Sequence, residues 1–318
     1  MGKIVATIRQ VIAGLSGRVT RKKQARPAGQ GQSRSMTKPK ANASFPGAVT
    51  RGLLTAGLVM LPAVMVPSTS AESAQMMVLL ALFAGVFVFI EYCSDYPGMI
   101  EFRFAAPFNR TRFLLIAVMV LSLSLLARAG SPAEGVAGFA QVLAASCAQV
   151  LDFAFSPVRL LVAALPGSVP EAHLLAVQHG ASLALVLGLT TVVAFWVAIR
   201  LNLWPMGPGP FNVWINLPMF DPTAGSDVVA RLLRTAKINI LLGILLPFLL
   251  PGIIMASALL VQPLSLESPV GFVWGIALWA FVPVSLIMRG IAMLRVARMI
   301  RANRRQFIDT ESSPLATA

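Results

Sequence analysis

The chain has 318 residues, of which 57% are hydrophobic and only 12% charged, and its formal net charge is +14. A soluble domain of ordinary composition carries about 25% charged residues, so this composition excludes a conventional soluble protein. The Lys and Arg residues flank apolar segments and are not interleaved with stacking aromatic residues, so we expect no nucleic-acid partner.

Six apolar runs are long enough to cross a membrane, because about 20 helical residues span roughly 30 Å of hydrocarbon. They cover residues 52–70, 74–92, 113–130, 180–200, 238–261 and 270–290. The first run is the weakest, since Pro62 and Pro67 interrupt it. The sequence therefore predicts an all-α polytopic membrane protein whose transmembrane domain, residues 52–290, contains about six transmembrane helices.

The distribution of positive charge predicts the orientation of these helices. When the six spans alternate across the membrane, 24 of the 26 Lys and Arg residues fall on one side, and only Arg128 and Arg159 fall on the other. Positive residues are retained on the cytoplasmic side. We therefore predict a bacterial inner-membrane protein with both termini in the cytoplasm, where its basic surface faces anionic lipids.

The N-terminal segment, residues 1–51, is basic and contains no acidic residue. Apolar residues between Ile4 and Leu15 share one helical face, which predicts an interfacial amphipathic helix followed by disordered residues. Two alternatives are open for this segment: a signal peptide that begins at Met36 and is cleaved near Ala71, or an organelle transit peptide. Under these alternatives residues 1–35 or 1–71 are missing from the mature protein.

Two segments in the predicted cytoplasmic loops share a pattern. Residues 100–104 and 211–217 alternate in the same way, and each leads to a proline and a further apolar residue. Strict alternation is typical of a half-buried strand, so we predict a short β-strand in each loop. The shared pattern also fits an internal two-fold repeat, in which spans two and three recur as spans four and five. Coincidence between two interfacial loops is the alternative.

The same loops concentrate unusual side chains. They hold or adjoin the only tyrosines of the chain, Tyr92 and Tyr96, together with Arg103, Trp204 and Trp214. Functional residues gather on loops that a rigid scaffold positions, so these five residues are candidates for binding a protein partner. An aromatic belt at the level of the lipid headgroups is the alternative.

The long outer loop, residues 131–179, carries helix-start signals. Ser131 begins a capping box with Glu134, the pair Ser156-Pro157 opens a second helix, and Ser168 repeats the signature before span four. The second helix is too short to span a bilayer. We predict two helices that lie on the outer leaflet, with a re-entrant pair as the alternative.

Residues 291–318 are predicted to form an Arg-rich cytoplasmic helix and tail. Four arginines share one face of this helix, and guanidinium groups on such a face pair with lipid phosphates. The predicted lipid contacts are Arg295, Arg298, Arg301 and Arg305.

No motif in the sequence predicts a catalytic, cofactor-binding or metal-binding site. His173 and His179 are the only histidines, and their spacing does not place them on one helix face. There is no nucleophile–base pair and no Gly-rich phosphate loop. Cys93 and Cys147 are predicted on opposite sides of the membrane, so they cannot form a disulfide with each other.

The leading hypothesis is a non-enzymatic accessory, assembly or scaffold protein that presents its two aromatic loops to a partner. A small-solute transporter or channel, built from the two-fold repeat around a kinked fifth span, is the alternative. The third hypothesis is a membrane enzyme acting on lipid, with acids and an amide near the inner headgroups. Its candidate residues are Glu91, Asp95, Glu101, Asn109 and Asp221.

Overall fold

The computed structural model describes residues 45–95, 98–128, 135–205, 211–221, 227–257 and 266–312. The predicted N-terminal amphipathic helix, the capping box at Ser131 and the side chain of Tyr96 lie outside these ranges. Everything that follows concerns the described residues.

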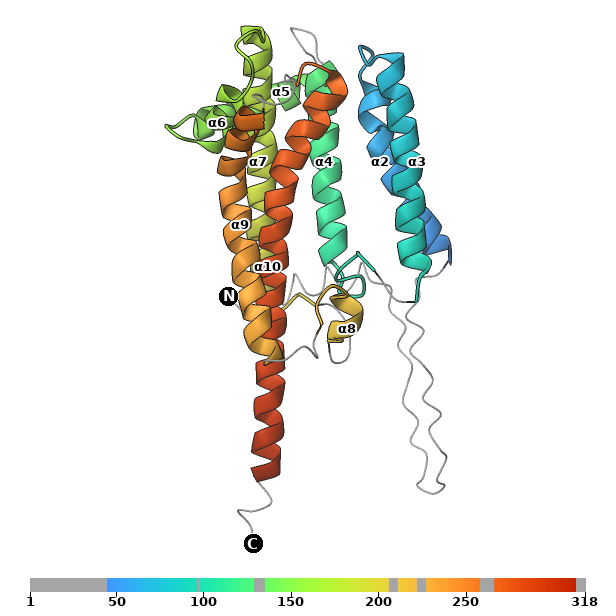
Figure 1. Ribbon diagram of the computed structural model, residues 1–318, viewed down its shortest axis with the longest axis vertical. Coiled ribbons are helices and arrows are strands. Elements are labelled where there is room, and N and C mark those ends of the chain that lie inside the picture. Colours follow the sequence, from blue (N-terminus) through green and yellow to red (C-terminus); the bar gives the residue numbers. More distant parts are fainter. Residues whose placement is uncertain are drawn as a thin grey trace. The chain divides into compact units, whose positions relative to one another are not determined.

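Six helices are long and apolar enough to cross a membrane, which confirms the prediction of a multi-pass membrane protein (Figure 1). They are α2 (Phe45–Met65), α3 (Ala71–Cys93), α4 (Phe108–Arg128), α7 (Glu171–Arg200), α9 (Val228–Ser257) and α10 (Pro269–Ser312). The first helix begins before its predicted start, and Arg51 lies along it, donating to the carbonyl oxygen of Gly47 at 2.6 Å. Pro62 lies buried inside α2 without ending it.

The helices α2 and α3 form a closely packed hairpin. A Cβ atom placed on Gly52 would lie 2.7 Å from the carbonyl oxygen of Gly85, so the two backbones meet directly. Small residues allow this approach between membrane helices. The rest of α3 exposes large apolar side chains such as Leu79 and Phe83, as a lipid-facing helix does. Through α2 the hairpin contacts α4 and α10.

The main core surrounds α10, which packs against α9, α7 and α4. Its buried face includes Met288, Ala292 and Val296, all fully inaccessible to solvent. Two glycines bring α9 and α10 together: a Cβ on Gly243 would lie 2.6 Å from the carbonyl oxygen of Pro283, and one on Gly290 would lie 2.7 Å from that of Ala236. This contact fixes the antiparallel register of the α9–α10 pair.

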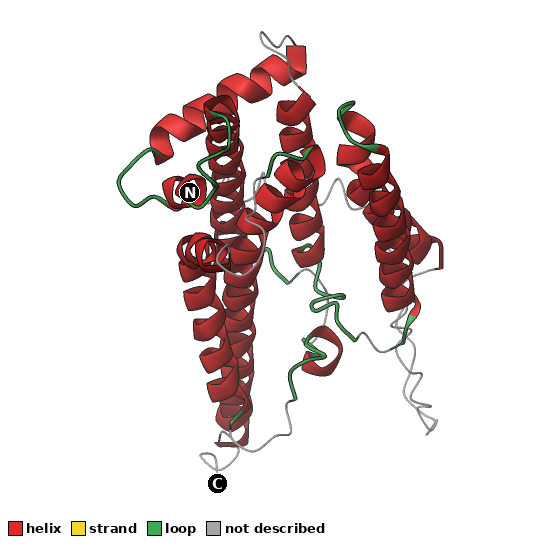
Figure 2. Ribbon diagram, turned by 45° about the horizontal axis from the view of Figure 1, so that its top comes forward, coloured by secondary structure: helices red, strands yellow, loops and turns green. Residues whose placement is uncertain are grey.

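Two helices lie between α4 and α7, as the sequence predicts: α5 (Gly135–Leu151) and α6 (Pro157–Ala163) (Figure 2). Ser156 caps α6 and accepts the backbone N–H of Arg159 at 3.1 Å. Alanines of α5 face its neighbours, while Phe139 and Val150 are exposed. The predicted cap by Ser168 is wrong, because α7 begins after Pro170 without any side-chain capping bond.

The prediction of two β-strands is wrong for the loops, since the described part of the chain contains no strand. Residues 101–104 form a turn in which Phe102 adopts a φ of 54°, and residues 211–217 include the one-turn helix α8 (Val213–Asn216). Asn212 caps α8 by accepting the N–H of Ile215 at 3.4 Å. Local side-chain capping of this kind competes with strand formation. The strand-based support for an internal repeat is therefore lost.

Candidate functional site

The two loops that share a sequence pattern contact each other. The N–H of Phe102 donates to the carbonyl oxygen of Asn216 at 2.6 Å, and the N–H of Phe104 donates to the side-chain oxygen of the same Asn216 at 3.1 Å. We call residues 98–107 and the described parts of 201–221 the loop junction. It lies at the end of the bundle where α3 ends and α4 begins, opposite α5 and α6 (Figure 1).

Trp204 is the centre of the loop junction. Its side chain is only 1% exposed, and its indole N–H donates to the carbonyl oxygen of Ala105 at 3.0 Å. The rings of Phe102 and Phe195 both lie 5.7 Å from it, between centroids, in edge-on geometry. Edge-to-face pairs at this distance are favourable beyond the area they bury. Trp204 therefore holds the loops together, and its predicted contact with a partner stays a prediction.

Arg103 fastens the loop junction to the end of α3. Its guanidinium donates to the carbonyl oxygen of Glu91 and, at 2.8 Å, to that of Ser94. The guanidinium carbon lies 5.8 Å from the ring centroid of Tyr92, and that of Arg51 lies 4.6 Å from the same ring. Burial lowers the pKa of Arg103 from its usual value. Arg103 and Tyr92 thus act within the protein as a cation–π and helix-end contact.

For two of the predicted partner-binding residues the structure describes no side chain. Tyr96 is outside the described residues, and only the backbone of Trp214 is described, within α8. Their predicted contact with a partner stays a prediction.

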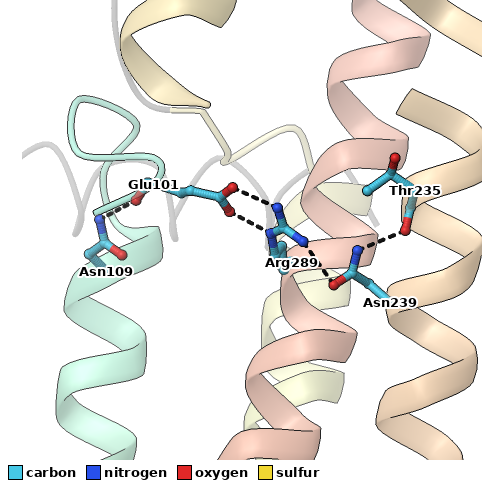
Figure 3. A network of polar contacts seen from close by, with 5 residues as sticks. All are labelled: Glu101, Asn109, Thr235, Asn239 and Arg289. Carbon is cyan, nitrogen blue, oxygen red and sulfur yellow. Dashed lines mark hydrogen bonds and ion pairs between the residues drawn. The ribbon is translucent and has the colours of Figure 1, made fainter. Parts of the chain in front are cut away.

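A buried ion pair joins the loop junction to α9 and α10 (Figure 3). Glu101 is 8% exposed, and its two carboxylate oxygens accept from Nε and Nη2 of Arg289 at 2.5 and 2.7 Å. The third nitrogen of Arg289 donates to Asn239 at 3.0 Å, and Asn239 donates to the carbonyl oxygen of Thr235 at 2.7 Å. Asn109 completes the network by donating to the backbone oxygen of Glu101 at 2.7 Å.

No local pattern in the sequence predicted this pairing, because Glu101 and Arg289 are 188 positions apart. A carboxylate that begins a loop and an arginine at the end of an apolar span are each common features alone. The bidentate geometry makes this pair the strongest polar link between distant segments among the described ion pairs.

Of the five residues proposed for a lipid enzyme, four form hydrogen bonds within the protein through a side chain or the backbone. Glu91 accepts the backbone N–H groups of residues 98, 99 and 100 at 3.1, 3.1 and 3.2 Å. Glu101 and Asn109 belong to the ion-pair network, and the backbone oxygen of Asp221 accepts from Arg231 at 2.7 Å. Asp95 is exposed. Among the described residues no three His, Cys, Asp or Glu side chains gather as a metal site.

The arginines of the last helix divide into two groups. Arg295 donates to the side chain of Asn202 at 2.8 Å, whereas Arg298, Arg301 and Arg305 are exposed. A further arginine, which the sequence did not single out, pairs with an acid: Arg304 lies 2.7 Å from Asp227. This bond holds the pKa of Asp227 below its usual value.

Comparisons of the chain with known protein families, with curated proteins and with solved structures found no match. Function is therefore argued from the geometry alone.

Proposed function

We propose that the chain is a non-enzymatic accessory or scaffold protein of a bacterial inner membrane, with both termini in the cytoplasm. In this proposal the end of α10 binds an acidic protein partner outside the lipid bilayer. The orientation rests on the positive charge at the loop-junction end of the helices, since basic residues are retained in the cytoplasm.

The observation that carries the proposal is the length of α10. Its 44 residues correspond to about 66 Å of helix, roughly twice the thickness of the hydrocarbon. Figure 1 shows α10 continuing along its own axis beyond the loop junction. From residue 301 to residue 306 every described side chain is exposed. In this part of α10 Arg304 pairs with Asp227, while Arg301 and Arg305 are exposed.

The position of the exposed arginines favours a partner over lipid. Arg301 and Arg305 follow Arg289 by 12 and 16 residues, about 18 and 24 Å along the axis. The headgroup layer adds only about 5–8 Å to each side of the hydrocarbon, and charges are screened beyond about 8 Å at physiological salt. We therefore propose an acidic protein surface as the ligand of Arg301 and Arg305, and keep lipid phosphates for Arg295 and Arg298.

The loop junction supports the same proposal. Its internal aromatic and ionic contacts form a fixed platform, and Asn202 and Asp227 both hold α10 through arginines. Exposed apolar side chains of the loop junction, such as Met99 and Met219, add adaptable contact area. The transporter alternative loses its main support with the β-strands, and we do not propose it.

Charge reversal at the tip of α10 tests the proposal. The tagged full-length protein, with Arg301→Glu and Arg305→Glu together, is purified in mild detergent and compared with the unchanged chain by quantitative mass spectrometry. We expect a stoichiometric partner to be lost at least about tenfold, because two charge-assisted contacts become repulsive. Arg128→Glu, at the opposite end of the bundle, is the matched control and should keep the partner.

Two results would contradict the proposal. One is full partner occupancy in the double variant. The other is a partner that dissociates equally from the Arg128→Glu control, since that outcome points to general loss of charge.

A further inference from the structure

An apolar groove lies between the α2–α3 hairpin and α10. Its volume is about 370 Å³, and it is lined by apolar residues that include Val59 and Met77 from the hairpin and Trp274 and Leu278 from α10. The indole N–H of Trp274 is buried without a hydrogen-bond partner among the described residues. A groove of this size and composition, at the depth of the hydrocarbon, accommodates an acyl chain.

One face of α10 leads from this groove to a positive charge. Leu278 and Val282 are 47% and 41% exposed along this face. Next to them lies Phe281, and the guanidinium carbon of Arg112 on α4 is 5.7 Å from its ring centroid. Phe281 follows Trp274 by seven residues, about 10 Å along the helix. The cation and the groove are therefore separated by less than the length of one acyl chain, which is about 15 Å, half the thickness of the hydrocarbon.

The charge of Arg112 is not neutralised within the described protein. Its Nε atom is buried without a hydrogen-bond partner, and none of the ion pairs between described residues includes it. Both carboxylate oxygens of Glu101 face Arg289 (Figure 3). Glu101 attracts Arg112, but Arg289 repels it. These three side chains together carry one excess positive charge.

The excess positive charge matters because of where Arg112 lies. The sequence places it just outside the third span, whereas the structure places it within the first turns of α4. An ionisable group inside a spanning helix is costly and requires a partner. The cation–π contacts with Phe108 and Phe281 supply only part of what a guanidinium needs.

We propose that Arg112 and the apolar groove together bind one anionic phospholipid. Its phosphate accepts hydrogen bonds from the Arg112 guanidinium, whose planar fork matches phosphate oxygens. One acyl chain follows the exposed face of α10 into the groove at Trp274. This site is separate from the tip of α10 and does not depend on a protein partner.

Native mass spectrometry of the purified full-length protein tests this site, with phosphatidylglycerol and phosphatidylcholine titrated in detergent. We expect one phosphatidylglycerol to bind above the background of further adducts, and Arg112→Gln to weaken that binding at least about tenfold. Arg128→Gln removes the same charge from the other end of α4 and should have no effect. Arg112→Lys, which keeps the charge, should recover part of the affinity and shows that the fold tolerates a change there.

A second variant separates lipid from free phosphate. Leu278→Trp fills the groove while leaving Arg112 in place, so it should also weaken phosphatidylglycerol binding. Inorganic phosphate, titrated as a competitor, should displace the lipid poorly. The proposal is overturned if Arg112→Gln and Arg128→Gln bind the lipid equally, if Leu278→Trp has no effect, or if inorganic phosphate competes as well as the lipid.

Discussion

Replacing Glu101 by Gln should destabilise the protein far more than the same replacement in an exposed ion pair. The change leaves Arg289 without its carboxylate and also removes the only acid that attracts Arg112. Removing one partner of a buried pair costs about 3–5 kcal/mol. The side chain of Arg289 is 27% exposed and that of Glu101 9%, and the Gln oxygen still accepts one bond. We therefore expect a loss of about 2–3 kcal/mol.

The matched control is Asp152→Asn. Asp152 pairs with Arg159 at 2.6 Å, but the two side chains are 43% and 50% exposed. A solvent-exposed ion pair contributes little to stability, because water and salt screen its charges. The two variants make the same chemical change at similar ion-pair distances, so burial is the main difference between them.

Thermal unfolding of the purified protein in detergent measures both changes. At about 2–4 °C per kcal/mol for chains of 150–250 residues, Glu101→Gln should lower Tm by about 4–12 °C and Asp152→Asn by much less. Adding Arg289→Gln to Glu101→Gln should recover part of the loss, because it removes the unpaired cation. Equal shifts for the two single variants would refute the assignment of Glu101–Arg289 as the main link between the loop junction and α10.

Further predictions concern packing, thiol chemistry and pH. Gly52→Ala should destabilise the α2–α3 hairpin by about 1–3 kcal/mol, because the added Cβ would collide with the backbone of α3. The control is Gly57→Ala, whose Cβ meets nothing within 4 Å. Equal melting temperatures for the two variants would contradict the close contact. Cys147 is buried and its burial raises the pKa of the thiol, so its alkylation by maleimide should be slow at pH 7 and still rising at pH 9. A rate like that of glutathione at both pH values would show that the thiol is exposed. The bond from Arg304 lowers the pKa of Asp227, so this contact is complete above the usual Asp range near pH 3.9 and is lost as pH falls through the lowered value. A spin label on the last turn of α10 should therefore gain mobility only in strong acid, whereas Asp227→Asn should release it at neutral pH; equal mobility in both proteins would exclude the contact.

The six membrane-spanning helices could be predicted because charge-free runs of this length have few other structures available. The ends of these helices were harder to predict, since they depend on particular side chains. Arg51 lies along α2 instead of ending it, and Arg112 enters α4 instead of remaining in the loop. Positive charge near a helix end fixes the side of the membrane, but it does not fix the last helical residue.

The loops could not be predicted from alternation alone. An alternating pattern reports that every second side chain is buried, and a turn packed around Trp204 buries Phe102 as effectively as a strand does. The capping side chain of Asn212 then favours a short helix. The ion pair of Glu101 and Arg289 could not be predicted, because no local pattern shows which distant segments meet. That depends on the tertiary packing.

The continuity of α10 also has a mechanical consequence. Ser312 follows the close contact at Gly290 by about 22 residues, or some 33 Å of uninterrupted helix. A tilt of about 5° at that contact moves the far end by about 3 Å, which is comparable to the length of a hydrogen bond. A load on the tip of this helix therefore acts first on the contacts of Arg304 with Asp227 and of Arg295 with Asn202, and only then on the ion pair of Arg289 and Glu101.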